Sequence, residues 1–143
     1  MKIISNSPKE TFEFAKKFAE TVVPGSILAL HGELGSGKTS FTKGLASGLG
    51  VKDEIKSPTF TLMNVYQTAN PTSCYLVHFD TYRLTSDKQF IEIGGEEYLE
   101  NSANISVVEW PEKIQEILKN KKVTNIFFRH LSENTREIST DNI

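Results

Sequence analysis

Residues 32–39 read Gly32-Glu33-Leu34-Gly35-Ser36-Gly37-Lys38-Thr39 and match the pattern G-x-x-x-x-G-K-[ST] at every defined position. The apolar run 27–30 before this loop is typical of a short buried strand. Residues 39–49 after it carry apolar side chains one turn apart, which predicts an amphipathic helix. A strand, a glycine-rich loop and a helix in this order form a polyphosphate cradle, because loop N–H groups and the helix N-terminus face the anion.

Lys38 and Thr39 supply the charged and metal-binding groups of such a loop. The Lys38 ammonium would reach the β- and γ-phosphates, and the Thr39 hydroxyl would bind the accompanying Mg²⁺. Gly35 and Gly37 let the main chain approach oxygen atoms that a Cβ would obstruct. The alternative is an ordinary glycine turn between a strand and a helix. The complete motif and the predicted strand and helix on its two sides favour the nucleotide site over this alternative. The pattern alone does not distinguish ATP from GTP, or a kinase from an ATPase.

Two acidic residues follow apolar strands, where a carboxylate could hold or orient Mg²⁺. Glu109 ends the run 105–108, and Asp80 ends the run 75–79. Their positions favour a metal or catalytic role over a helix cap or a surface carboxylate. Thr59 could sense the γ-phosphate, although the local sequence favours a turn that opens a strand. His78 alternates with its apolar neighbours and is more typical of a structural histidine than of a metal ligand.

The rest of the pattern predicts an α/β fold. Residues 7–10 form a capping box with proline at the first helical position. The segments 60–66 and 74–80 predict an antiparallel pair, and 89–101 predicts short helical pieces broken at Gly94. A buried strand over 105–108, a helix over 111–118, and strands over 123–131 and 136–140 follow. We therefore expect a single-domain P-loop NTPase sandwich over 1–143, with a mixed, partly antiparallel sheet flanked by helices. The strand order stays open.

Composition narrows the class of protein. The chain has 143 residues and a net charge of −2, which argues against a domain-wide nucleic-acid surface. Its one cysteine, Cys74, excludes an intramolecular disulfide and a cysteine-based zinc site, and packing is its expected role. No run approaches a membrane span, and no signal-peptide core is present. A soluble cytoplasmic protein without membrane contact is expected.

Four separated blocks together resemble the TsaE family, also called YjeE, the small ATPase of bacterial tRNA threonylcarbamoyladenosine (t6A) synthesis. The blocks are Gly32–Thr39, Ser57–Leu62, His78–Leu84 and Val108–Glu112. The first block is shared with many NTPases, whereas the other three in this order are specific to the family. The resemblance therefore implies an ATP-binding, Mg²⁺-dependent ATPase.

The resemblance also implies roles for individual residues. Lys38 would bind phosphate, Thr39 and Glu109 would coordinate Mg²⁺, and Asp80 would contact the metal or the attacking water. The catalytic candidates are thus Asp80, Lys38 and Glu109, and the metal-binding candidates are Thr39, Glu109 and Asp80. The expected nucleotide-binding residues are Gly32, Glu33, Leu34, Gly35, Ser36, Gly37, Lys38, Thr39, Ser40, Thr59, Trp110, Thr11 and Arg136.

The partners implied by the resemblance are TsaD and TsaB, with tRNA engaged indirectly through their complex. The chain alone would be a monomer or weakly self-associating. No residue stands out as an arginine finger, although Arg83 is the nearest candidate, so we expect slow turnover that rises when a partner completes the site. A small-molecule or nucleotide kinase is the main alternative, but the chain has only three arginines for an acceptor lid: Arg83, Arg129 and Arg136. The chain lacks the guanine-recognition motif that is expected of a regulatory GTPase. A purely structural module would not need the loop lysine and threonine.

Overall fold

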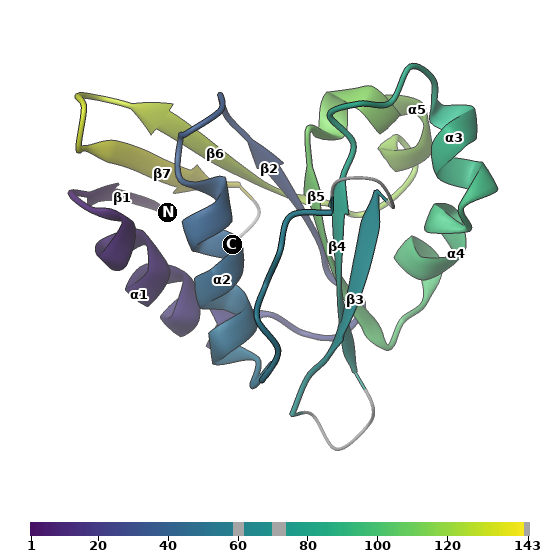
Figure 1. Ribbon diagram of the computed structural model, residues 1–143, viewed down its shortest axis with the longest axis horizontal. Coiled ribbons are helices and arrows are strands. Elements are labelled where there is room, and N and C mark those ends of the chain that lie inside the picture. The colour runs from purple at the N-terminus through teal and green to yellow at the C-terminus, as the bar shows by residue number, and fades with distance from the viewer. Residues whose placement is uncertain (59–61, 70–73, 142–143) are drawn as a thin grey trace.

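A seven-stranded mixed sheet runs through the computed structural model, which describes residues 1–58, 62–69 and 74–141 (Figure 1). The strand order is β1-β7-β6-β2-β5-β4-β3. The four central strands β6, β2, β5 and β4 pair in parallel. Strands β3 and β7 pair antiparallel with β4 and β6, and β1 pairs antiparallel with β7. The strands are β1 (Lys2–Ser5), β2 (Ile27–His31), β3 (Met63–Gln67), β4 (Tyr75–Asp80), β5 (Asn104–Glu109), β6 (Thr124–His130) and β7 (Arg136–Thr140).

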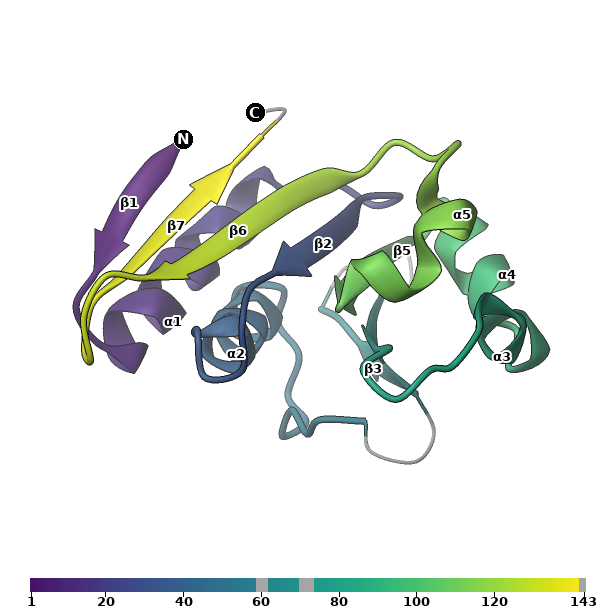
Figure 2. The ribbon, with the colours of Figure 1, turned by 90° about the horizontal axis from the view of Figure 1, so that it is seen from above.

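Helices cover both faces of this sheet. They are α1 (Pro8–Phe18), η1 (Ala19–Thr21), α2 (Lys38–Gly48), α3 (Asp87–Glu92), α4 (Gly95–Glu100), η2 (Pro111–Ile114) and α5 (Gln115–Leu118). One buried core joins α1 and α2 to β2, β5 and β6, and the other joins α3, α4 and α5 to β4 and β5. Figure 2 shows α1 and α2 beneath β7, β6 and β2, with α3, α4 and α5 grouped near β5.

Local sequence explains where α1 begins. The Glu10 backbone N–H donates to the Ser7 Oγ at 3.1 Å, and Pro8 occupies the first turn. A serine cap satisfies an N–H group that has no partner inside the helix, and proline lacks an N–H to be satisfied. The predicted start of this helix is confirmed.

Glycines bring α1 and α2 into backbone contact. A Cβ added at Gly44 would lie 2.2 Å from the Phe12 carbonyl oxygen, and one at Gly48 would lie 2.4 Å from the Lys16 carbonyl oxygen. Both obstacles are main-chain atoms of α1, which cannot turn aside as a side chain can. The close packing of the two helices therefore requires glycine at these positions.

Replacing Gly44 by alanine is expected to lower the free energy of unfolding by about 2–3 kcal/mol. Alanine gains roughly 1 kcal/mol of helix propensity, but the contact with Phe12 forces the helices apart and outweighs that gain. Urea unfolding measures the difference. The matched control is Lys43→Ala on the exposed face of α2, which should change stability by less than about 0.5 kcal/mol. Equal stability of the two variants would refute the packing argument.

Most expected elements are present. The strand before the loop, the helix after it, the β3–β4 pair, the broken helical segment and the two C-terminal strands are confirmed. The segment expected to be helical over 111–118 forms a 3₁₀ turn followed by the single turn of α5. Strand β1 is not expected from the sequence, and it pairs with β7 at the edge of the sheet. Part of the extended segment expected over 60–66 lies outside the described residues. Among the helices of the described ranges, none has the length and apolarity to cross a bilayer.

Candidate nucleotide-binding site

The loop between β2 and α2 has a shape that depends on glycine. Gly37 precedes α2 with φ of +108°, a left-handed conformation that side chains rarely adopt. At Gly32 an added Cβ would lie 2.6 Å from the Ser36 Oγ and 3.0 Å from Phe128. The loop therefore packs closely around Gly32, and a larger residue there would have to displace Ser36 and Phe128.

Several N–H groups of the loop have no acceptor among the described residues. The Ser36 N–H donates to the Glu33 carbonyl at 3.1 Å, and the Ser36 Oγ is buried with no hydrogen-bond partner in the described ranges. Within the described part of the chain, no acceptor receives the N–H groups of Gly35, Gly37, Lys38, Thr39 and Ser40. Unpaired amides at the start of a helix are the donors that bind a phosphate group. The loop thus has the donors that a polyphosphate requires.

Lys38 lies across this loop. Its Nζ donates to the Gly32 carbonyl at 2.8 Å and stands 3.8 Å from the centre of the Trp110 ring. Only 5% of the residue is exposed. Burial lowers the pKa of Lys38, and the carboxylates of Glu109 and Asp80 oppose that shift. The ammonium is therefore held among acids and an aromatic ring at the mouth of the loop.

Asp80 and Glu109 end neighbouring strands at the same edge of the sheet. They are direct partners in the β4–β5 register, and Glu109 is also opposite Leu30 of β2, shortly before the loop. Val77 and Val108 belong to the core under α3–α5, so the alternate positions Asp80 and Glu109 lie on the face that carries α2. The structure thus brings both predicted acids to the side of the sheet where the loop and Lys38 lie.

The two acids have different surroundings. The Glu109 side chain is 7% exposed, and its Oε2 lies 2.5 Å from the His78 Nε2, within hydrogen-bonding distance. Asp80 is half-buried, and its Oδ1 accepts the Tyr82 N–H at 3.1 Å. Burial raises the pKa of Asp80, the Tyr82 N–H lowers it, and the Glu109 charge raises it further. Asp80 also lines a cavity of about 120 Å³ together with Arg83.

Replacing Asp80 by asparagine is expected to raise the melting temperature of the ligand-free protein at pH 7.5. The pKa of Asp80 is raised above its usual 3.8 in the fold, so the native state favours the protonated acid. Protonated Asp80 therefore contributes to the free energy of unfolding. This contribution is fully present below pH 3.8 and is lost as the pH rises through the raised pKa of Asp80. The advantage of the variant should therefore be small near pH 4 and larger at pH 7.5, as measured by thermal unfolding at both pH values. A less stable variant at pH 7.5 would contradict this electrostatic interpretation.

Trp110 has a strained backbone beside Lys38. Its φ is +60°, which non-glycine residues seldom adopt. The Thr81 hydroxyl is within hydrogen-bonding distance of the carbonyl oxygens of Glu109 (2.9 Å) and Trp110 (2.6 Å), and the Tyr82 and Trp110 rings lie 4.9 Å apart. Such strain persists only where surrounding contacts hold it, and it is frequent at functional sites. Thr81 and Tyr82 were not singled out from the sequence, although both lie in the block 78–84.

Thr11 and Arg136 approach the loop from its other side. Both lie 3.8 Å from the place that a Gly37 Cβ would occupy. Arg136 donates to the carbonyls of Gly35 at 3.0 Å and Glu133 at 2.9 Å, and the Thr11 hydroxyl is paired with Ser5 at 2.7 Å. Residues from both ends of the chain are therefore placed against the same loop.

The remaining predicted residues have a simpler description. Thr39 and Ser40 occupy the first turn of α2, with Thr39 exposed and Ser40 half-buried. Glu33 and Leu34 are exposed on the loop. Thr59 lies outside the described residues, so its predicted role stays a prediction. No cluster of three or more His, Cys, Asp or Glu side chains that could hold a metal is found in the described ranges.

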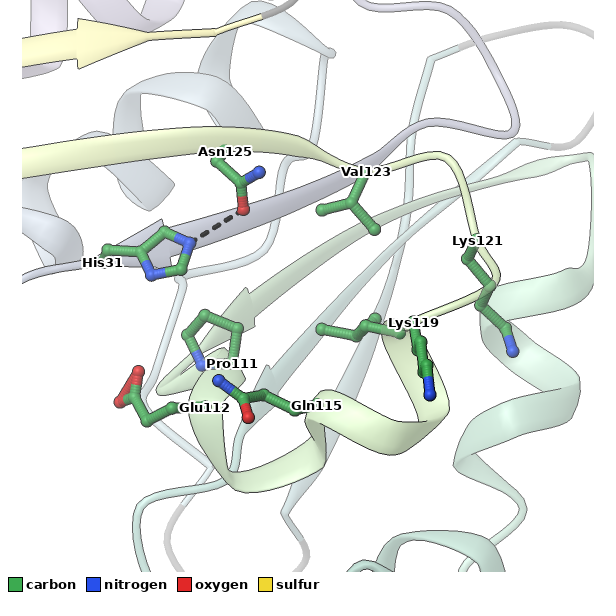
Figure 3. Close-up of a pocket in the computed structure, with 9 residues that line it drawn as sticks. His31, Pro111, Glu112, Gln115, Lys119, Lys121, Val123 and Asn125 are labelled. Atoms are coloured by element: carbon green, nitrogen blue, oxygen red, sulfur yellow. Dashed lines mark hydrogen bonds between the residues drawn. The ribbon is translucent and has the colours of Figure 1, made fainter.

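A separate cavity of about 390 Å³ lies on the opposite face of β2 (Figure 3). His31 and Asn125 line it, joined by a hydrogen bond of 2.8 Å, and Gln115 of α5 lies across from them. Lys121 at its end is paired with Glu96 at 3.1 Å. None of residues 32–39 lines this cavity, so it is not part of the loop site.

Comparison with known proteins relates the chain to one family. The profile of the family described as threonylcarbamoyl adenosine biosynthesis protein TsaE matches residues 5–138. The TsaE protein of Treponema pallidum, named a tRNA threonylcarbamoyladenosine biosynthesis protein, is 39% identical and covers 97% of this chain and 98% of its own. The Bacillus subtilis protein of the same name is 37% identical, over 93% of this chain and 80% of its own.

A solved structure agrees with these sequence matches. The crystal structure of Bacillus subtilis YdiB superimposes with a TM-score of 0.74 at 34% sequence identity, covering 98% of this chain and 83% of that one. The sheet, the P-loop and the sequence matches all lead to the same assignment. The chain belongs to the TsaE family.

Proposed function

We propose that the chain binds ATP with Mg²⁺ at the loop 32–39 and hydrolyses it during the threonylcarbamoyladenosine modification of tRNA. One observation carries the proposal: unpaired loop amides, the Lys38 ammonium and two aligned carboxylates lie together at one edge of the sheet. Cationic and N–H groups on one side and carboxylates on the other are what a metal–triphosphate complex requires. The naming of the relatives supports the pathway.

The residues present fit Mg²⁺. The Thr39 hydroxyl and the carboxylates of Asp80 and Glu109 supply oxygen donors, which Mg²⁺ prefers, and its remaining positions would go to phosphate oxygens and water. Bound there, Mg²⁺ would neutralise the charge of the phosphate groups. The buried Ser36 Oγ, which has no partner in the part of the chain that the structure describes, is a further polar group at the loop.

The chain's own residues would position the triphosphate. The loop amides and Lys38 hold it, and Asp80 or Glu109 orients a water molecule for in-line attack on the γ-phosphorus. Lys38 would exchange its present bond to the Gly32 carbonyl for phosphate oxygens. Trp110 limits the freedom of the Lys38 ammonium from the other side.

Partner proteins would complete this site. Arg83 shares a cavity with Asp80 but makes no ion pair in the described part of the chain, so no arginine is fixed toward the loop from that side. Slow hydrolysis by the isolated chain should therefore rise when TsaB and TsaD are added. The ATPase would reset that complex between rounds of threonylcarbamoyl transfer.

A reconstituted threonylcarbamoylation system with TsaB, TsaD and tRNA tests the function. Product beyond one turnover per complex should require both this chain and hydrolysable ATP. Equal product without the chain would remove the proposed role. Phosphorylation of an added nucleoside or nucleoside monophosphate, without release of free phosphate, would favour a small kinase instead.

A further inference from the structure

A buried histidine is bonded to one of the candidate catalytic acids. The side chains of His78 and Glu109 are only 2% and 7% exposed, and the His78 Nε2 lies 2.5 Å from the Glu109 Oε2. The two residues are 31 positions apart in the sequence and come from neighbouring strands. This contact is therefore made by the fold and not by local chain geometry.

Strand geometry places His78 behind both acids. His78 and Asp80 are two residues apart on β4, so they share one face of the sheet, and Glu109 faces the same way from β5. The ring that is bonded to Glu109 thus shares one face of the sheet with both carboxylates that the proposed function uses.

The hydrogen bond divides the Glu109 carboxylate into two unlike oxygens. An ionised carboxylate only accepts, so the His78 Nε2 carries the proton and donates to Oε2. The other oxygen, Oε1, receives no hydrogen bond in the described part of the chain. Carboxylates that bind metals are commonly held in this way by a neighbouring donor, which fixes their orientation.

The second ring nitrogen argues against a purely structural histidine. The His78 Nδ1 is buried and has no hydrogen-bond partner within the described residues. Buried polar atoms are nearly always paired in native proteins, so a histidine kept only for packing would satisfy both nitrogens or be replaced by an apolar residue. Of the two ring nitrogens of His78, Nε2 has a hydrogen-bond partner in the described part of the chain, and that partner is Glu109.

We propose that His78 is a positioning residue for ATP hydrolysis, whose Nε2–H fixes one oxygen of Glu109 so that the other is presented to the metal–triphosphate complex. The inference rests on the proposed function, because it assigns His78 to the same site. His78 does not touch the reacting atoms and acts only through Glu109. Its removal should therefore affect the metal-dependent part of nucleotide binding more than the metal-free part.

Two isosteric variants test this role. The amide nitrogen of glutamine can reach the position of Nε2, whereas that of asparagine stops at the position of Nδ1. His78→Asn should weaken the apparent Mg²⁺ affinity of the ATP-bound protein by about 10-fold or more, and His78→Gln should stay within about threefold of the original chain. Metal-free ATP binding should change by less than about twofold in both. The fluorescence of Trp110, the single tryptophan, reports both titrations.

Turnover and stability measurements separate positioning from folding. In His78→Asn the kcat for ATP should fall with KM little changed, and His78→Gln should restore it. Val77→Ala, a buried neighbour on the other face of β4, is the control that loses stability without loss of Mg²⁺ affinity. Equal Mg²⁺ affinities in the asparagine and glutamine variants would overturn the proposal.

A measurement on the unaltered chain covers the case in which a variant fails to fold. Nitrogen-15 NMR of the histidines should show the His78 proton on Nε2, with its resonance shifting when Mg²⁺ is added to the ATP-bound protein. A proton on Nδ1 alone, or a resonance insensitive to Mg²⁺, would overturn the inference. If the unaltered chain binds no ATP, the proposed function itself fails, and this outcome is distinct from all the others.

Discussion

Replacing Lys38 by alanine is expected to lower ATP turnover by at least about 100-fold and to weaken ATP binding by about 10-fold. The Lys38 ammonium lies 2.8 Å from the Gly32 carbonyl and faces the acids of the site, so it is already where phosphate oxygens would arrive. No other described lysine is buried at this loop. Phosphate release and a fluorescence titration with ATP measure the two effects.

Loss of folding would not account for the expected fall in ATP turnover of Lys38→Ala. Burial lowers the pKa of Lys38, so the fold disfavours the charged amine, whereas the bond to the Gly32 carbonyl and the contact with Trp110 stabilise the side chain. Thermal unfolding of Lys38→Ala should show that the variant remains fully folded at the temperature of the assay. Lys43→Ala, an exposed lysine five residues further along α2, is the activity control. Turnover of Lys38→Ala within threefold of this control would contradict the role of the loop.

Replacing Glu109 by glutamine should lower ATP turnover by about 100- to 1,000-fold while ATP still binds in the absence of metal. The amide oxygen of glutamine can still accept the bond from His78, so the buried pair keeps its shape and loses only the negative charge. That charge is what would attract Mg²⁺. Single-turnover hydrolysis at several Mg²⁺ concentrations measures the effect.

A neighbouring carboxylate provides the matched control for this change. Glu112 also faces Lys38 but is exposed on η2, outside the register that aligns Asp80 with Glu109. Glu112→Gln should keep turnover within about threefold of the original chain. If both glutamine variants lose the same activity, general negative charge near the loop is sufficient and Glu109 has no specific role.

Local pattern predicted much of the fold, and it also indicated which residues form the candidate site. The loop 32–39 has a complete motif between a strand and a helix, and each flank is formed by residues within a few positions of it. Asp80 and Glu109 were recognisable because an apolar run ends at each of them. Both conclusions needed only short-range periodicity and the rule that ligands meet the carboxyl ends of parallel strands.

What the sequence did not reveal depends on contacts between distant segments. Strand β1 is four residues long, and it pairs with β7, which lies more than 130 positions away in the sequence. The bond between His78 and Glu109 and the anchoring of Trp110 by Thr81 require the β4–β5 register, which no local pattern specifies. Thr11 and Arg136 meet at Gly37 for the same reason. Sheet topology, and not residue type, brings these side chains together.

A crystal structure with a non-hydrolysable ATP analogue and Mg²⁺ is the most direct test of the claim that this loop and two strand-end acids form one catalytic site. We expect the triphosphate on the amides of residues 35–40, Lys38 moved from the Gly32 carbonyl to the phosphates, and the metal bound by Thr39 with Glu109 and Asp80 at direct or water-bridged distance. A triphosphate bound elsewhere, or a metal that neither acid approaches, would contradict the account.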